Sequence, residues 1–137
     1  MSAGYSGTPL PRKLGIKEGH RVAFVRAPET FEGVLGRLPD GVLVRKRLGP
    51  SDVVVAFFTR RAELERRWDA LTRAIRFDGG LWIAWPKRAS GVETDLTEDV
   101  VREIALERGL VDNKVCAIDE TWSGLRLVYR VRDRPGR

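Results

Sequence analysis

The sequence has little of the residue types on which many catalytic and structural sites depend. It contains one cysteine and one histidine in 137 residues. A single cysteine excludes an internal disulfide, which fits a reducing cytosol. The single histidine, His20, precedes the first predicted strand, where it cannot complete a Ser-His-Asp or Cys-His arrangement or a histidine-rich metal site. We therefore predict no catalytic triad and no bound metal.

Long apolar segments are also missing. No uninterrupted apolar run approaches the ~20 residues that a membrane-spanning helix needs, and the first residues lack the apolar core of a signal peptide. We expect a cytoplasmic protein without a membrane segment. Its length fits one domain.

Glycine is missing where a nucleotide or S-adenosylmethionine would need it. Such cofactors call for a glycine-rich turn after the first strand, because the backbone must approach the ligand closely. Here that turn reads RAPETF (residues 26–31), and the next glycine is Gly33. The second predicted strand ends in Arg45–Arg47 instead of an acid that could bind ribose hydroxyls. The sequence therefore predicts no cofactor.

What is present is an alternation of apolar strands and amphipathic helices. Leu64, Trp68, Leu71 and Ile75 form one apolar seam at helical spacing, and Thr97 suits the N-cap of a later helix. Turns are expected at 78–80, which reads DGG, and at 121–124, which reads TWSG. Predicted strands span 22–25, 42–48, 52–59, 80–87, 113–120 and 125–132, with helices at 29–38, 60–76 and 98–108.

This order predicts a three-layer, Rossmann-like α/β fold. Strands that alternate with helices form a mostly parallel sheet, here of about six strands, with a C-terminal antiparallel hairpin. The pattern resembles a class I methyltransferase fold shortened by one helix–strand unit, with a reversed strand between two parallel ones. We expect an arm at 1–13, a single domain at 14–133 and a tail at 134–137.

The carboxyl ends of the strands are the expected binding site, because ligands of open α/β sheets bind there. Two loops, one around 85–91 and one at 119–124, should lie side by side at this end. Trp82 and Trp85 are three residues apart and should face opposite sides of the sheet. The candidate ligand-binding residues are Trp85, Lys87, Ser90, Asp119, Glu120, Trp122 and Ser123.

Three functions fit these observations. The absence of a glycine turn and of catalytic groups favours a non-catalytic binding or regulatory module for a protein or a small anionic ligand. The strand order alone suggests a divergent S-adenosylmethionine-dependent methyltransferase-like enzyme. The net charge of +6 allows weak nucleic-acid binding, although the basic residues are scattered. The basic strand at 42–48, if it is a sheet edge, could pair with a second copy of the chain.

Three segments carry a family resemblance. AGYSGTPLPRKLGIKEGHRV, GGLWIAWPKRASGVETDLTEDVVRE and GLVDNKVCAIDETWSGLRLV resemble the bacterial family catalogued as domain of unknown function 3052. The resemblance implies no particular activity. It does draw attention to Tyr5, Ser6, Gly7 and Thr8, since so specific a motif suggests that the arm folds over the sheet or docks on a neighbouring subunit.

Overall fold

The computed structural model describes residues 7–133. Tyr5, Ser6 and the predicted tail at 134–137 lie outside the described residues. Helices and strands occur in the order α1 (Leu10–Lys13), β1 (Arg21–Val25), α2 (Phe31–Leu35), β2 (Leu43–Arg45), β3 (Ser51–Phe57), α3 (Arg61–Ala74), β4 (Ile75–Pro86), α4 (Glu98–Glu107), β5 (Leu110–Ala117) and β6 (Trp122–Tyr129). Short 3₁₀ turns follow at Arg88–Ser90 and Val131–Asp133.

The six strands form one mixed sheet in the order β2-β1-β3-β4-β6-β5. The first four of these are parallel, whereas β6 runs antiparallel to both β4 and β5. A reversed strand therefore lies between two that run the other way, which confirms the predicted Rossmann-like fold and its antiparallel hairpin. The basic strand β2 lies at a sheet edge, as predicted.

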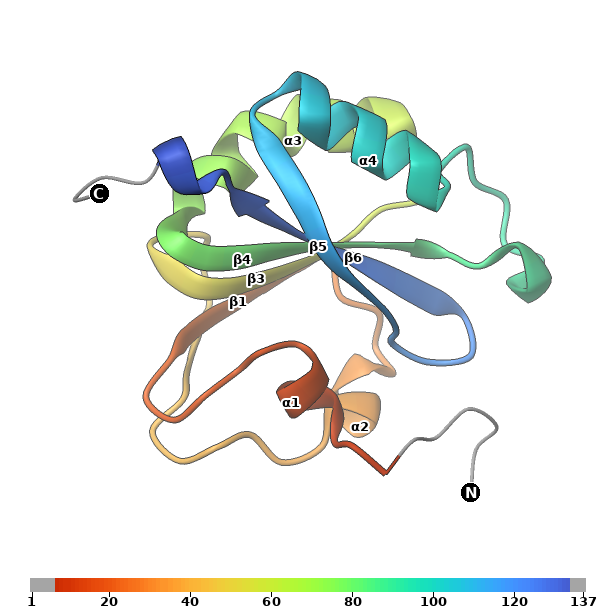
Figure 1. Cartoon of the computed structure of the whole chain (residues 1–137). Helices are drawn as coiled ribbons and strands as arrows, with labels where there is room; N and C mark the ends of the chain where they lie inside the picture. The colour runs from red at the N-terminus through yellow and green to blue at the C-terminus, as the bar shows by residue number, and fades with distance from the viewer. Residues whose placement is uncertain (1–6, 134–137) are drawn as a thin grey trace.

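Helices cover both faces of the sheet, so the fold has three layers (Figure 1). On one face α3 and α4 pack over Val54, Leu81 and Ile83. On the other face α1, α2 and their loops pack over Val53 and Val55. Alternating residues of β3 thus enter opposite cores, as the period of two along a strand requires.

The first three residues of the helical seam and the capping residue are where the sequence placed them, whereas Ile75, predicted as the last seam residue, begins β4. Leu64, Trp68 and Leu71 are each at most 2% exposed and lie against the sheet. The hydroxyl of Thr97 accepts a hydrogen bond from the Val100 amide at 3.1 Å, so it caps α4. Residues 10–13, within the predicted arm, form α1, and Leu10 contributes to the second core.

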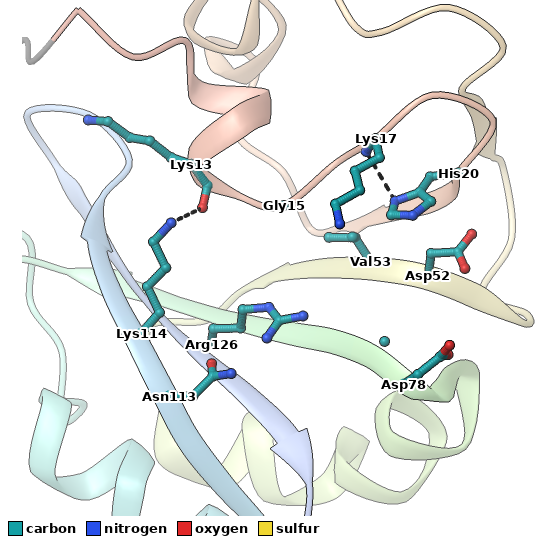
Figure 2. A pocket seen from close by; sticks show the side chains of 11 residues that line it. Lys13, Gly15, Lys17, His20, Asp52, Val53, Asp78, Asn113, Lys114 and Arg126 are labelled. Carbon is teal, nitrogen blue, oxygen red and sulfur yellow. Dashed lines mark hydrogen bonds between the residues drawn. The ribbon is translucent and has the colours of Figure 1, made fainter. Parts of the chain in front are cut away.

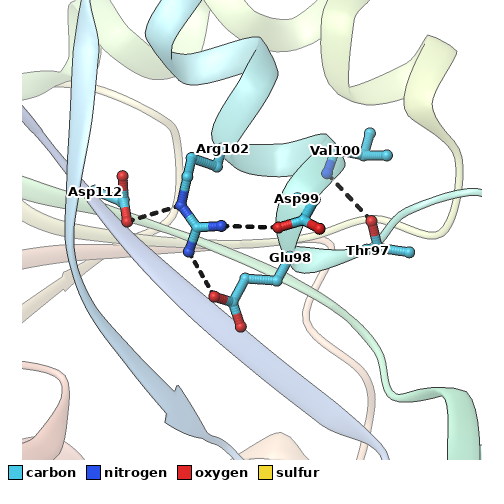
Figure 3. Close-up of polar contacts among 6 residues, drawn as sticks. All are labelled: Thr97, Glu98, Asp99, Val100, Arg102 and Asp112. Carbon is cyan, nitrogen blue, oxygen red and sulfur yellow. Dashed lines mark hydrogen bonds and ion pairs between the residues drawn. The ribbon is translucent and has the colours of Figure 1, made fainter.

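The acidic residues before and within α4 hold structure together, as predicted. Figure 3 shows Arg102 donating hydrogen bonds to Glu98 and Asp99 of its own helix and, at 3.0 Å, to Asp112 of β5. The hydrogen bonds to Glu98 and Asp112 raise the pKa of Arg102. Asp95 accepts a hydrogen bond from the Arg61 amide at 2.7 Å, which satisfies a free N–H at the start of α3.

The turn predicted at 78–80 is wrong, because β4 continues through it. The register between β3 and β4 shifts here, between Ser51 and Val53. A Cβ on Gly79 would come within 2.6 Å of the Asp52 carbonyl oxygen. This glycine therefore permits a close strand-to-strand approach in an irregular ladder and does not end the helix.

The hairpin turn is also displaced from its predicted place. Residues 122–124, predicted as a turn, belong to β6, and the chain reverses just before them. Asp119 explains the shift, because its carboxylate accepts hydrogen bonds from the amides of Thr121 and Trp122, both at 2.8 Å. An aspartate that binds the backbone two residues ahead specifies a turn at its own position.

Candidate functional site

The carboxyl ends of the parallel strands form a rim to which four loops contribute. The loops after β4 and before β6 are neighbours, as predicted: Trp85 pairs with Ser123, and Pro86 pairs with Trp122. The Lys87 amide extends this pairing with a 2.7 Å hydrogen bond to the Thr121 carbonyl. We call the loops at 26–30, 58–60, 87–91 and 118–121 the carboxyl rim.

Much of the hydrogen-bonding capacity of the candidate residues is used within the rim. The ammonium group of Lys87 donates to the Asp119 carbonyl at 2.6 Å. The hydroxyl of Ser90 donates to the Lys87 carbonyl at 2.6 Å and accepts from the Val92 amide. One carboxylate oxygen of Asp119 accepts the two backbone hydrogen bonds of the turn before β6. Glu120 is exposed, and Ser123 is half-buried within β6.

The tryptophans near the rim divide between the two cores. Trp85 is 6% exposed and packs with the α3 and α4 side chains. Trp82 lies on the other face, where its indole N–H donates to the Leu14 carbonyl at 2.9 Å. The two therefore face opposite ways, as their spacing predicted. Trp122 is half-buried on the same face as Trp82.

A row of four aromatic rings closes the face that carries α2. Phe24, Phe31, Phe57 and Trp122 contact one another in sequence, edge to face, with ring centroids 5.0–5.1 Å apart. Edge-to-face contacts of this kind stabilise beyond the area that they bury. Sequence analysis missed this row, although all four residues are apolar and close to predicted strand ends.

The loop after β1 has a glycine-like backbone without a glycine. Arg26 has a φ of 59°, the left-handed region that non-glycine residues seldom adopt. Its guanidinium lies 5.3 Å from the centre of the Phe58 ring and pairs with Glu63 of α3 at 2.9 Å. An arginine side chain therefore stands where a nucleotide-binding turn would leave backbone open to a ligand.

A cavity of about 420 Å³ lies at the opposite end of the sheet. It is lined by residues from α1 and the loop after it, from the starts of β3 and β4, and from β5 and β6 (Figure 2). His20 borders it, and sequence analysis placed this residue correctly at the end away from the rim. No sequence pattern pointed to the cavity, because its lining comes from segments far apart in the chain.

Two kinds of feature are missing from residues 7–133. Within this range, no group of three or more His, Cys, Asp or Glu side chains could hold a metal ion. Nor does the described part of the chain contain a helix with the length and hydropathy to span a bilayer.

Several solved structures share the fold. DhpI, solved as a complex with SAH, aligns over 90% of this chain and 83% of its own, with a TM-score of 0.62 and 12% identity. A SAM-dependent methyltransferase from Aquifex aeolicus aligns over 85% of both chains, with a TM-score of 0.56 and 17% identity. The ribosomal protein L11 methylase from Lactobacillus delbrueckii subsp. bulgaricus covers 89% of this chain and 75% of its own, with a TM-score of 0.56 and 12% identity.

These neighbours correct the function predicted from sequence. No family model and no curated protein matches the chain. These two comparisons therefore do not support the resemblance to domain of unknown function 3052. The leading hypothesis of a non-catalytic module is contradicted by the fold, which solved methyltransferases share over most of this chain. The shared fold favours the methyltransferase-like alternative. The fold itself is that of these enzymes.

Proposed function

We propose that this chain is a divergent methyltransferase-like enzyme that acts with S-adenosylmethionine at the carboxyl rim. One observation carries the proposal: a parallel sheet with β6 reversed between β4 and β5, in the arrangement that the solved methyltransferases share. In such sheets the ligand lies beyond the carboxyl ends of the strands. The proposal replaces the prediction that no cofactor is used.

The residues of this rim do not fit the usual cradle for that cofactor. The backbone at Arg26 has the left-handed turn, but its side chain is tied to Glu63 and Phe58. The end of β2 carries Arg45, whose guanidinium donates to the Pro50 carbonyl at 2.8 Å, where an acid would bind ribose. No step of the reaction is therefore assigned to particular residues. S-adenosylmethionine would be held by contacts that differ from this usual cradle.

The seven predicted residues remain candidates for the side of the rim away from β1. Lys87, Ser90, Asp119, Glu120 and Ser123 line the paired loops there, with Trp122 beneath them. Trp85 is buried below the surface and would support the site from within. From the sequence we also propose that the chain belongs to the bacterial domain of unknown function 3052 family, that it is cytoplasmic and that its partner is a small ligand.

Calorimetric titration of the full chain with S-adenosylmethionine and S-adenosylhomocysteine tests the proposal. We expect saturable binding below about 1 mM, the upper end of ordinary enzyme substrate ranges. Glu29 is the exposed acidic side chain of the loop after β1, so Glu29→Gln should weaken binding at least about threefold if the cofactor lies there, through loss of a charged hydrogen-bond acceptor.

The matched control is Glu107→Gln, which removes the same charge at the exposed C-terminal end of α4. It should leave the affinity unchanged. Absence of heat and of thermal stabilisation at 5 mM of either compound, with folded protein, would remove the methyltransferase proposal.

A further inference from the structure

The cavity at the amino ends of the strands is a second candidate site, separate from the carboxyl rim. Its volume of about 420 Å³ lies within the range of roughly 300–1,000 Å³ typical of small-molecule sites. It opens beside the end of α1, with the starts of β3 and β4 on one side and β5 and β6 on the other (Figure 2).

Basic groups converge on this cavity from separate segments. Figure 2 shows the Lys17 ammonium and the Arg126 guanidinium approaching the same space from opposite sides. Lys114 of β5 also lines the cavity, and its ammonium donates a 2.9 Å hydrogen bond to the Lys13 carbonyl. The side chain of Lys13 itself extends away from the cavity. Three cations from three elements thus border one small volume.

His20 adds an imidazole ring to the lining. Its Nδ1 accepts a hydrogen bond from the Lys17 amide at 3.1 Å. A ring nitrogen that accepts cannot carry the hydrogen, so in the neutral ring the hydrogen lies on Nε2. The ring is thereby fixed in orientation with a donor left for another partner, in a loop that also positions Lys17.

Gly80 of β4 leaves room for the side chain of Arg126, which lines the cavity. A Cβ on Gly80 would come within 2.5 Å of the Arg126 Nε and 2.8 Å of its Cζ. Only the absence of a side chain therefore lets the guanidinium lie across the β4 backbone. The planar, multidentate donor group of Arg126 therefore lies close to the β4 backbone at the cavity.

The acidic residues of the lining lie together on the other wall. Asp52 accepts from the Arg21 amide at 2.8 Å and pairs with Arg76 at 3.3 Å, so its charge is largely balanced outside the cavity. Asp78 is exposed at the same wall. The lining therefore combines cations from opposite sides of the cavity with carboxylates able to accept hydrogen bonds from hydroxyl groups.

From this arrangement we infer that the cavity binds a small phosphate monoester that carries hydroxyl groups. The phosphate would lie against Arg126, Lys17 and Lys114, which supply charge-assisted hydrogen bonds. The hydroxyl-bearing part would face Asp78. Inorganic phosphate alone leaves most of the volume unfilled, so the site favours an organic phosphate about the size of a pentose phosphate.

The test is an amide NMR titration of the full chain at constant ionic strength with inorganic phosphate, ribose 5-phosphate and ribose. We expect saturable shifts around Gly15, Lys17, Gly79 and Lys114. Ribose 5-phosphate should bind about tenfold more tightly than inorganic phosphate, and ribose should not bind. Lys17→Gln should weaken ribose 5-phosphate at least about fivefold, from loss of one charge-assisted contact.

Lys46→Gln is the control, because Lys46 is an exposed lysine near the far end of β2. It should change the affinity less than twofold. Equal weakening in both variants would mean that net charge alone attracts the anion, and the site would be discarded. No shift at 10 mM ribose 5-phosphate, or shifts seen only with a short RNA oligonucleotide, would also overturn the inference.

Discussion

At the carboxyl ends of the strands, aromatic rings pack together and hydrogen bonds join the rim loops, whereas at the amino ends charged side chains surround a cavity. Phe31 of α2 packs against Phe24 and Phe57 at the ends of β1 and β3, and Lys87 of the rim donates to the Asp119 carbonyl. The cavity is bordered by Lys17, Lys114 and Arg126 instead. In a fold whose ligands bind at the carboxyl ends, this chain has closed part of that end while leaving space at the other.

The difference between the two ends shows that the fold alone does not determine which ligand binds. The strand order is that of methyltransferases, yet the loop after β1 and the end of β2 carry Arg26 and Arg45 in place of the expected glycine and acid. A fold fixes where loops converge, while the side chains on those loops decide what can bind. Substitutions at either end of the sheet can therefore show which residues stabilise the fold and which residues bind a ligand.

The largest expected effect comes from opening the aromatic row. Phe31 is 2% exposed and contacts two other rings, so Phe31→Ala should lower the free energy of unfolding by about 3–5 kcal/mol. Urea denaturation measures the loss. Leu43→Ala, at a side chain that is 54% exposed on β2, should cost less than about 1 kcal/mol. Similar losses in the two variants would mean that the rim is not packed as described.

A smaller loss is expected at the irregular start of β4. Gly79→Ala places a Cβ within 2.6 Å of the Asp52 carbonyl oxygen, which is backbone and cannot rotate away. The strands must separate, at a cost of about 1–3 kcal/mol. Gly33→Ala in α2 meets no atom within 4 Å and should stabilise the chain by about 0.5–1 kcal/mol. Thermal unfolding measures both changes in stability. The account would be contradicted if both variants were stabilised or both were destabilised.

The smallest effect is expected at the loop after β1. Arg26→Gly relieves the left-handed backbone of about 1 kcal/mol of strain, but it removes an exposed ion pair and a ring contact worth about as much together. The free energy of unfolding should therefore change by less than about 1 kcal/mol. A loss of several kcal/mol in chemical denaturation would show that Arg26 holds the loop closed far more firmly than its contacts imply.

The sequence predicted those features that depend on local pattern. The apolar run of β3, the Leu64–Trp68–Leu71 seam and the Thr97 cap each have a periodicity or a residue type that specifies the structure. Together with the alternation of strands and helices, they were sufficient for the fold and for the adjacency of the two rim loops.

Features that depend on tertiary contact were missed. Gly79 and Gly80 looked like a turn, because their reasons for being glycine, the Asp52 carbonyl and the Arg126 guanidinium, lie on other strands. The turn before β6 was shifted, since Thr121–Gly124 resembles a loop unless the Asp119 carboxylate is seen on the backbone. The cavity joins segments as far apart as Lys13 and Arg126, which no local spacing reveals.

The most direct test of the central claim is an amide NMR map of S-adenosylmethionine binding to the full chain. The account predicts saturable shifts in the rim loops at 26–30, 58–60 and 87–91, with the amides around Lys17 and Lys114 unmoved. Shifts confined to the cavity at the amino ends, or none at 5 mM ligand, would contradict it.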